Sequence, residues 1–164
     1  MHNTRRHMLI ALMAMGLMVA ATHHSLAEDQ VVKVSLADKG LELEMPTTLG
    51  MGMGGDISKA TMSIEVNEAT LKAGKITFEV TNVSEEMIHE MLIAPVADSS
   101  VPLPYSADEY RVIEEASGYL GEISDLDPLA SGALTLTLKP GTYILFCNLP
   151  GHYMAGMWTL VTVV

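Results

Sequence analysis

The sequence contains a single cysteine, Cys147, among 164 residues, and this scarcity limits the chemistry that the chain can perform. A lone cysteine cannot form an intramolecular disulfide. It also excludes a haem attached through Cys-x-x-Cys-His and a dinuclear copper centre, because both need a second cysteine. The solitary thiol needs another explanation, and metal ligation is one.

Basic residues are also few. The chain has 9 lysines and arginines against 20 aspartates and glutamates, which gives a net charge of −11. Nucleic-acid binding depends on basic side chains that neutralise phosphates. This charge balance argues against nucleic acid as a partner.

The apolar run near the N-terminus is too short for a spanning helix. It covers 14 residues, 8–21, whereas a membrane-spanning helix needs ~20. Arg5 and Arg6 precede it, and small residues at 25–27 offer a cleavage site, as in an export signal. We therefore expect residues 1–27 to be a cleavable signal peptide, and the mature protein to be periplasmic without stable membrane insertion.

Two other interpretations of this segment stay open. An uncleaved membrane anchor is the first. The second is a twin-arginine signal, which Thr4-Arg5-Arg6 suggests although the rest of that pattern is incomplete. A lipoprotein anchor is excluded, because no cysteine lies near the cut.

Histidine becomes scarce once the signal peptide is removed. Four of the six histidines lie in residues 1–27, so only His89 and His152 remain. The same segment carries two arginines and no acid, so the net charge changes from −11 to −13. The remaining 137 residues suit one domain, in which 28–60 supply N-terminal strands and a Met/Gly-rich loop and 61–164 the core.

Short alternating segments predict an all-β domain. Apolar and polar residues alternate in 62–66, 76–80 and 134–138, as in half-buried antiparallel strands. Further strand candidates are 31–36, 88–93, 142–146 and 157–164. So many short strands in one domain favour a two-sheet sandwich.

Two connecting segments have distinct patterns. Residues 107–116 carry Tyr110, Ile113 and Glu114 at helical spacing after Ser106 as a candidate cap, which predicts one short helix between the sheets. The Met-Gly-Met-Gly-Gly run at 51–55 predicts a flexible loop.

Three soft donors stand at even intervals in one short segment: Cys147, His152 and Met157. Thiolate, imidazole and thioether suit copper, and a His₂Cys site with a weak axial Met describes a blue-copper electron-transfer centre. His89 is the histidine left to complete the set. Taken singly, Cys147 could be a small buried hydrophobe, Met157 core filling and His89 an ordinary histidine. Their joint occurrence favours one copper ion bound by all four.

Two stretches resemble the cupredoxins of the plastocyanin/azurin superfamily. They are residues 73–82 running into His89, and residues 139–157. Four residues lie between Cys147 and His152 and four between His152 and Met157, a spacing similar to that of rusticyanin-type ligand loops. The resemblance implies a Greek-key β-sandwich with one type 1 copper. Many electron-carrying members have Asn or Ser after the upstream histidine, and that side chain braces the cysteine loop. Glu90 stands at this position here, and it either changes this bracing or is a solvated strand residue.

We expect the chain to carry single electrons. An exposed edge of His152 among Pro150, Tyr153 and Met154 would be the port, and the partner a redox protein such as a c-type cytochrome or a copper-dependent oxidase. Seven acids could dock a basic partner or merely solvate the surface: Asp108, Glu109, Glu114, Glu115, Glu122, Asp125 and Asp127.

The alternative is a periplasmic protein for copper buffering, delivery or tolerance. Seven further methionines could bind Cu(I) or fill the core: Met45, Met51, Met53, Met62, Met87, Met91 and Met154. We expect no catalysis, because multicopper oxidases and nitrite reductases need more histidines. A Cys–His nucleophile would also need an orienting third group, and none is evident.

Overall fold

The structure is a computed structural model that describes residues 29–40 and 45–164, so the predicted signal peptide lies outside the described residues. The described chain is built from β-strands, with one 3₁₀ turn, η1 (Ile57–Lys59), and one short helix, α1 (Glu114–Ser117). The predicted all-β class is therefore confirmed. Among these residues, no helix has the length and apolar character needed to cross a membrane.

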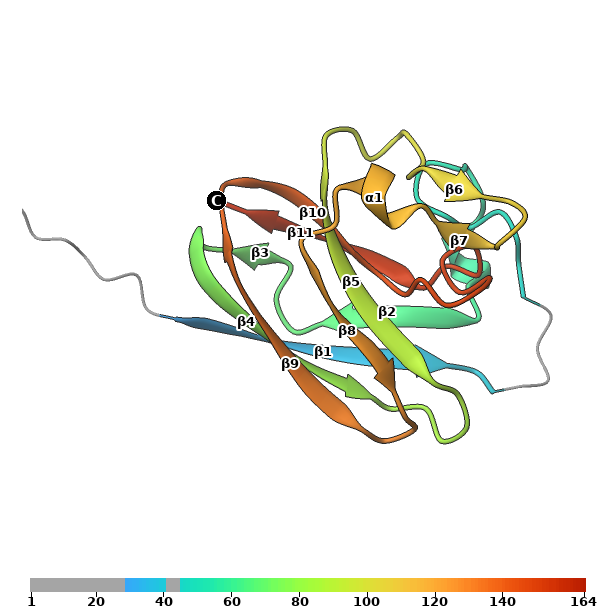
Figure 1. The fold of residues 1–164 in the computed structure, drawn as a ribbon, viewed down its shortest axis with the longest axis horizontal. Helices are drawn as coiled ribbons and strands as arrows, with labels where there is room; N and C mark the ends of the chain where they lie inside the picture. The colour runs from blue at the N-terminus through green and yellow to red at the C-terminus, as the bar shows by residue number, and fades with distance from the viewer. Residues whose placement is uncertain (1–28, 41–44) are drawn as a thin grey trace, which may run out of the picture.

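Two sheets form the sandwich, and Figure 1 shows them lying one over the other. The first has the order β2 (Met62–Val66), β1 (Gln30–Asp38), β4 (Gly74–Asn82), β9 (Ser131–Leu138). The second has the order β3 (Thr70–Leu71), β11 (Trp158–Val163), β10 (Gly141–Phe146), β5 (His89–Val96), β8 (Gly121–Leu126). β1 pairs with β4 in parallel, and β10 pairs antiparallel with both β5 and β11.

The main core lies between the sheets and follows the alternation in the sequence. Ile76, Phe78 and Val80 of β4 are fully buried, whereas the residues between them are more exposed. They pack with inward side chains of β5 and β10, such as Met91 and Leu145. Apolar burial on one face of each strand is therefore what joins the sheets.

A second core covers the other face of the second sheet. Leu92 of β5 and Phe146 of β10 pack there against Met51 and Tyr153. Met51 is almost fully buried, so the expectation of a flexible Met/Gly-rich loop is wrong at this residue. The loop has no strand or helix, but its first methionine fills the core. β5 and β10 are consequently enclosed on both faces.

The predicted helix at 107–116 is wrong in position. The chain there forms β6 (Tyr105–Ser106) and β7 (Arg111–Val112), and α1 begins only at Glu114. Ser106 does accept a hydrogen bond from the Glu109 N–H (3.3 Å), as a cap would. Tyr110, however, has φ 56°, outside the helical region, and turns the chain into β7. Strand pairing therefore overrides the helical spacing.

Candidate metal centre

Three of the four predicted ligands meet at one end of the sandwich. His89 begins β5, Cys147 follows β10, and His152 lies in the loop that leads to β11. His152 Nδ1 lies 3.3 Å from both His89 Nδ1 and Cys147 Sγ. One donor atom from each residue lies within 4.8 Å of the other two. The fold therefore gathers two imidazoles and a thiol into one group.

This group is shielded from solvent. His89 and Cys147 are completely buried, and His152 is 7% exposed. Cys147 belongs to the main core between the sheets. A metal held here would be largely shielded from bulk water.

The backbone of Met157 is hydrogen-bonded to two members of the donor group. Its N–H donates to the His152 carbonyl (3.0 Å), and its carbonyl accepts from the Cys147 N–H (3.1 Å). The side chain is fully buried in the same core cluster as Cys147. This arrangement joins the two ends of the ligand loop, residues 147–157, while ligation by the Met157 thioether stays a prediction.

Two glycines give the ligand loop its shape. Gly151 has φ 83° and Gly156 φ 98°, in the region that side chains disfavour. A Cβ at Gly156 would also lie 2.6 Å from the Cβ of Ala60. The turn before His152 and the turn before Met157 therefore both require glycine.

Neighbouring connections hold the ligand loop from outside. The buried Asn148 accepts from the Val112 N–H (2.7 Å) and donates to the Val112 carbonyl (3.0 Å). The Gly151 N–H donates to the Tyr110 carbonyl (2.8 Å), and Trp158 Nε1 donates to the Leu49 carbonyl (2.6 Å) just after the loop. Figure 1 shows these connections and the loop gathered at one end of the molecule. The loop is thus fixed on two sides.

Burial sets the protonation of the metal-free group. It raises the pKa of Cys147 to about 12, although the backbone amides of Glu90 and Leu149 hydrogen-bond the sulfur and act in the opposite direction. Burial, reinforced by the neighbouring His89, lowers the pKa of His152 to about 4. Burial also lowers the pKa of His89, against the opposing effect of Asp38. At neutral pH the site therefore holds a protonated thiol and two neutral imidazoles.

Asp38 is a member of the site that sequence reasoning missed. Its Oδ2 lies 2.9 Å from His89 Nε2, and its side chain is 5% exposed. Asp38 is the last residue of β1, so it reaches the site from the other sheet. No local motif marks it, because 51 positions separate it from His89.

Glu90 is not solvated, so that interpretation is wrong. It is almost completely buried, and its Oε1 has no hydrogen-bond partner. Burial raises the pKa of Glu90 to about 7, against the attraction of Arg111. A buried carboxyl group therefore follows His89 directly along the chain.

His152 borders a shallow hollow of about 430 Å³ on the surface. Met87, Ile88, Leu149 and Pro150 also line it. Tyr153, expected beside the exposed edge of His152, is instead fully buried in the second core. The surface at His152 is therefore mostly apolar, but it does not include Tyr153.

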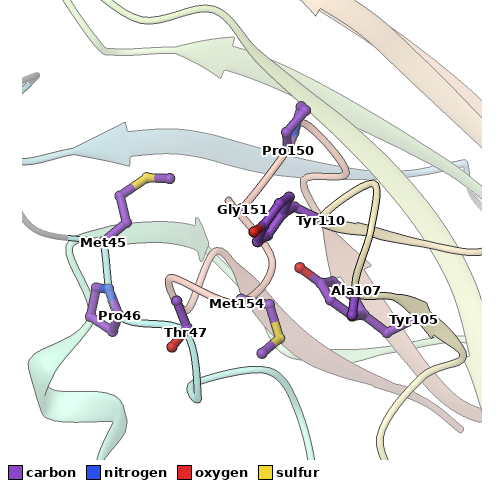
Figure 2. Close-up of a pocket in the computed structure, with 9 residues that line it drawn as sticks. All are labelled: Met45, Pro46, Thr47, Tyr105, Ala107, Tyr110, Pro150, Gly151 and Met154. Carbon is purple, nitrogen blue, oxygen red and sulfur yellow. The ribbon is translucent and has the colours of Figure 1, made fainter.

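An apolar cavity of about 440 Å³ lies beside the ligand loop (Figure 2). Its walls come from residues 45–47, from 105–110 and from the loop at 150–154. Figure 2 shows Tyr110 beside Gly151, with the thioethers of Met45 and Met154 coming from different segments. Three other surplus methionines, Met51, Met62 and Met91, are buried, as core filling requires.

Comparisons with known proteins give structural similarity alone. No family model and no curated protein match the chain. Reduced auracyanin from Roseiflexus castenholzii superposes with a TM-score of 0.50 at 20% identity, covering 84% of this chain and 98% of that one. Auracyanin A, described as a blue copper protein from Chloroflexus aurantiacus, gives 0.51 at 18%, covering 82% and 98%.

A rusticyanin variant structure gives a TM-score of 0.50 at 19% identity, covering 82% of this chain and 78% of that one. These likenesses agree with the mostly β-sheet structure and the near absence of helix in the described residues. Together with the buried His89, Cys147 and His152 group, they confirm the predicted fold class. The chain has the cupredoxin fold, the fold of auracyanin and rusticyanin.

Proposed function

We propose that this chain is a type 1 copper protein that binds one copper ion and transfers single electrons. The observation that carries the proposal is the buried group of the Cys147 Sγ and one ring nitrogen each from His89 and His152, all within 4.8 Å of one another. A His₂Cys donor set is diagnostic of blue-copper sites among transition-metal centres. His89, Cys147 and His152 would hold the ion, with Met157 as the weak axial ligand.

The chemistry of the donors fits copper. Thiolate and imidazole suit this metal, and when bound it supplies a one-electron couple. Electron transfer needs similar geometry in both oxidation states. Asn148 bonds Val112 and Trp158 bonds Leu49, while the Met157 backbone bonds His152 and Cys147, and these hydrogen bonds support such a fixed arrangement.

A partner would approach His152, because it borders the apolar hollow at the surface. Glu86 and Asp125 line the same hollow, and the wider surface carries exposed acids at Asp108, Glu109 and Glu122. Charge complementarity accelerates encounter between small redox proteins. We therefore propose a basic redox partner, such as a c-type cytochrome, or a copper-dependent oxidase, in the periplasm.

Copper buffering or delivery is the second candidate. Its support is reduced by the burial of Met51, Met62 and Met91, which leaves them as parts of the core. Met45 and Met154 still line an open cavity. These two thioethers, together with those of the partly buried Met53 and Met87, are the remaining basis for additional Cu(I) binding.

One titration separates the two functions. The purified protein is loaded with Cu(II), and its visible spectrum, copper stoichiometry and reduction potential are measured. One copper per chain, an intense cysteine-to-copper band and reversible one-electron reduction support the carrier. A colourless protein that binds several Cu(I) ions supports copper handling instead.

A further inference from the structure

We propose that Asp38 is a positioning residue of the metal centre, which holds His89 in the tautomer that leaves Nδ1 free for the metal and adds a negative charge behind that ligand. This inference rests on the proposed copper function. It goes further by assigning a role to a residue of the opposite sheet.

The two ring nitrogens of His89 face different surroundings. Nδ1 lies 3.3 Å from His152 Nδ1, inside the donor group. Nε2 lies 2.9 Å from Asp38 Oδ2. An ionised carboxylate only accepts hydrogen bonds, so the proton of a neutral His89 ring sits on Nε2. Nδ1 then carries the lone pair that a metal needs.

The Asp38 carboxylate is itself held in place. Oδ1 accepts from the Gly40 N–H (2.7 Å), and the Ser84 hydroxyl also hydrogen-bonds the carboxylate. Ser84 Oγ in turn accepts from the N–H groups of Glu86 (3.2 Å) and Met87 (2.9 Å). These contacts fix the direction in which the carboxylate faces His89.

The same contact ties the two sheets together at the site. Asp38 ends β1 of the first sheet and pairs there with Met62 of β2, whereas His89 begins β5 of the second sheet and Cys147 directly follows β10 of that sheet. Both side chains of the pair are almost completely buried. The ring orientation of His89 thus depends on the packing of one sheet on the other.

A carboxylate does more than a neutral acceptor could. Outer-shell carboxylates raise the basicity of a ligating histidine as well as orienting it. A nearby negative charge also favours the more positive oxidation state, Cu(II), over Cu(I). Asp38 is therefore expected to lower the reduction potential of the centre.

The first test uses the metal-free protein and ring-nitrogen NMR of histidine. Wild-type His89 should carry its proton on Nε2 and have a bare Nδ1 at pH 7. A His89 ring protonated on Nδ1 overturns the proposal without any variant. This measurement tests the role of Asp38 even if the protein binds no copper. A failure to bind copper would contradict the proposed function and leave the result on the His89 tautomer unchanged.

The second test compares the copper-loaded wild type with Asp38→Asn, which keeps the shape and removes the charge. We expect Cu(II) binding to weaken about tenfold relative to Cu(I), which corresponds to a potential about 59 mV higher. Asp98→Asn is the matched control, since Asp98 is an exposed loop aspartate that accepts a hydrogen bond from the Ser100 N–H. An Asp38→Asn potential equal to that of the wild type and the control overturns the proposal.

Discussion

Cys147 Sγ lies 3.3 Å from His152 Nδ1 although four residues separate them along the chain. The loop can fold back so tightly because Gly151 adopts φ 83° and the Met157 backbone bonds both residues. Regular spacing in the sequence thus becomes one compact group of donors.

Met157→Leu should keep the cysteine-to-copper band and raise the reduction potential of the copper-loaded protein. A weak axial thioether tunes the potential of a blue-copper site, and leucine removes that donor while keeping similar bulk. Spectroscopy and redox titration measure both quantities. Met91→Leu is the control, because Met91 is equally buried in the same core. Equal potentials in the two variants would show that Met157 only fills the core.

The fold could largely be predicted from the sequence, because alternation along a strand reports directly on burial. Ile76, Phe78 and Val80 illustrate this. The spacing of Cys147 and His152 also placed two donors on one loop. Asp38 and Asn148 could not be found, since their partners come from distant strands and connections.

The helix was misplaced for a related reason. The helical spacing of Tyr110, Ile113 and Glu114 is a local signal, whereas the β6–β7 pair and the bonds of Val112 to Asn148 depend on tertiary structure. Local propensity is a weak guide when such contacts compete with it.

Copper affinity should rise about tenfold for each pH unit between pH 6.5 and 8. Burial raises the pKa of Cys147 to about 12, so the free thiol is protonated throughout this range, and binding as thiolate releases one proton. Both imidazoles are already neutral, because burial lowers their pKa values, that of His152 to about 4. Competition titrations against a chelator of known affinity measure the slope. An affinity independent of pH would mean that no thiolate is formed.

Glu90→Gln should stabilise the metal-free protein at pH 8 by on the order of 3 kcal/mol. Burial raises the folded-state pKa of Glu90 to about 7 from 4.5, so the folded state binds more protons between these values. The wild type therefore loses stability as the pH rises through this window, and the variant avoids that loss.

Urea unfolding of both proteins at pH 4.5 and pH 8 checks this effect. The gain should vanish at pH 4.5, where folded Glu90 is protonated and carries no charge. Burial lowers the pKa of His152, so this residue makes the folded state more stable as the pH rises, which is opposite to the effect of Glu90. His152 is present in both proteins, so its contribution cancels when the variant is compared with the wild type. A gain that is the same at both pH values would contradict the assignment.

Asn148→Ala should lower the free energy of unfolding of the metal-free protein by about 3 kcal/mol. The change leaves two backbone groups of Val112 without their partners in a buried region, at ~1–3 kcal/mol each. Denaturant titration measures the loss. Asn67→Ala is the control, because Asn67 bonds the Lys33 N–H at an exposed position and should cost much less. Equal losses would show that Asn148 does not fix the ligand loop.

The visible spectrum of the Cu(II)-loaded protein, recorded beside that of Cys147→Ser, tests the central claim most directly. Cys147 is the only cysteine in the chain, so no other thiol can replace it. We predict an intense cysteine-to-copper band with one copper per chain in the wild type, and its complete loss in the variant. A wild type without this band, or a variant that keeps it, would contradict the assignment of a type 1 copper site.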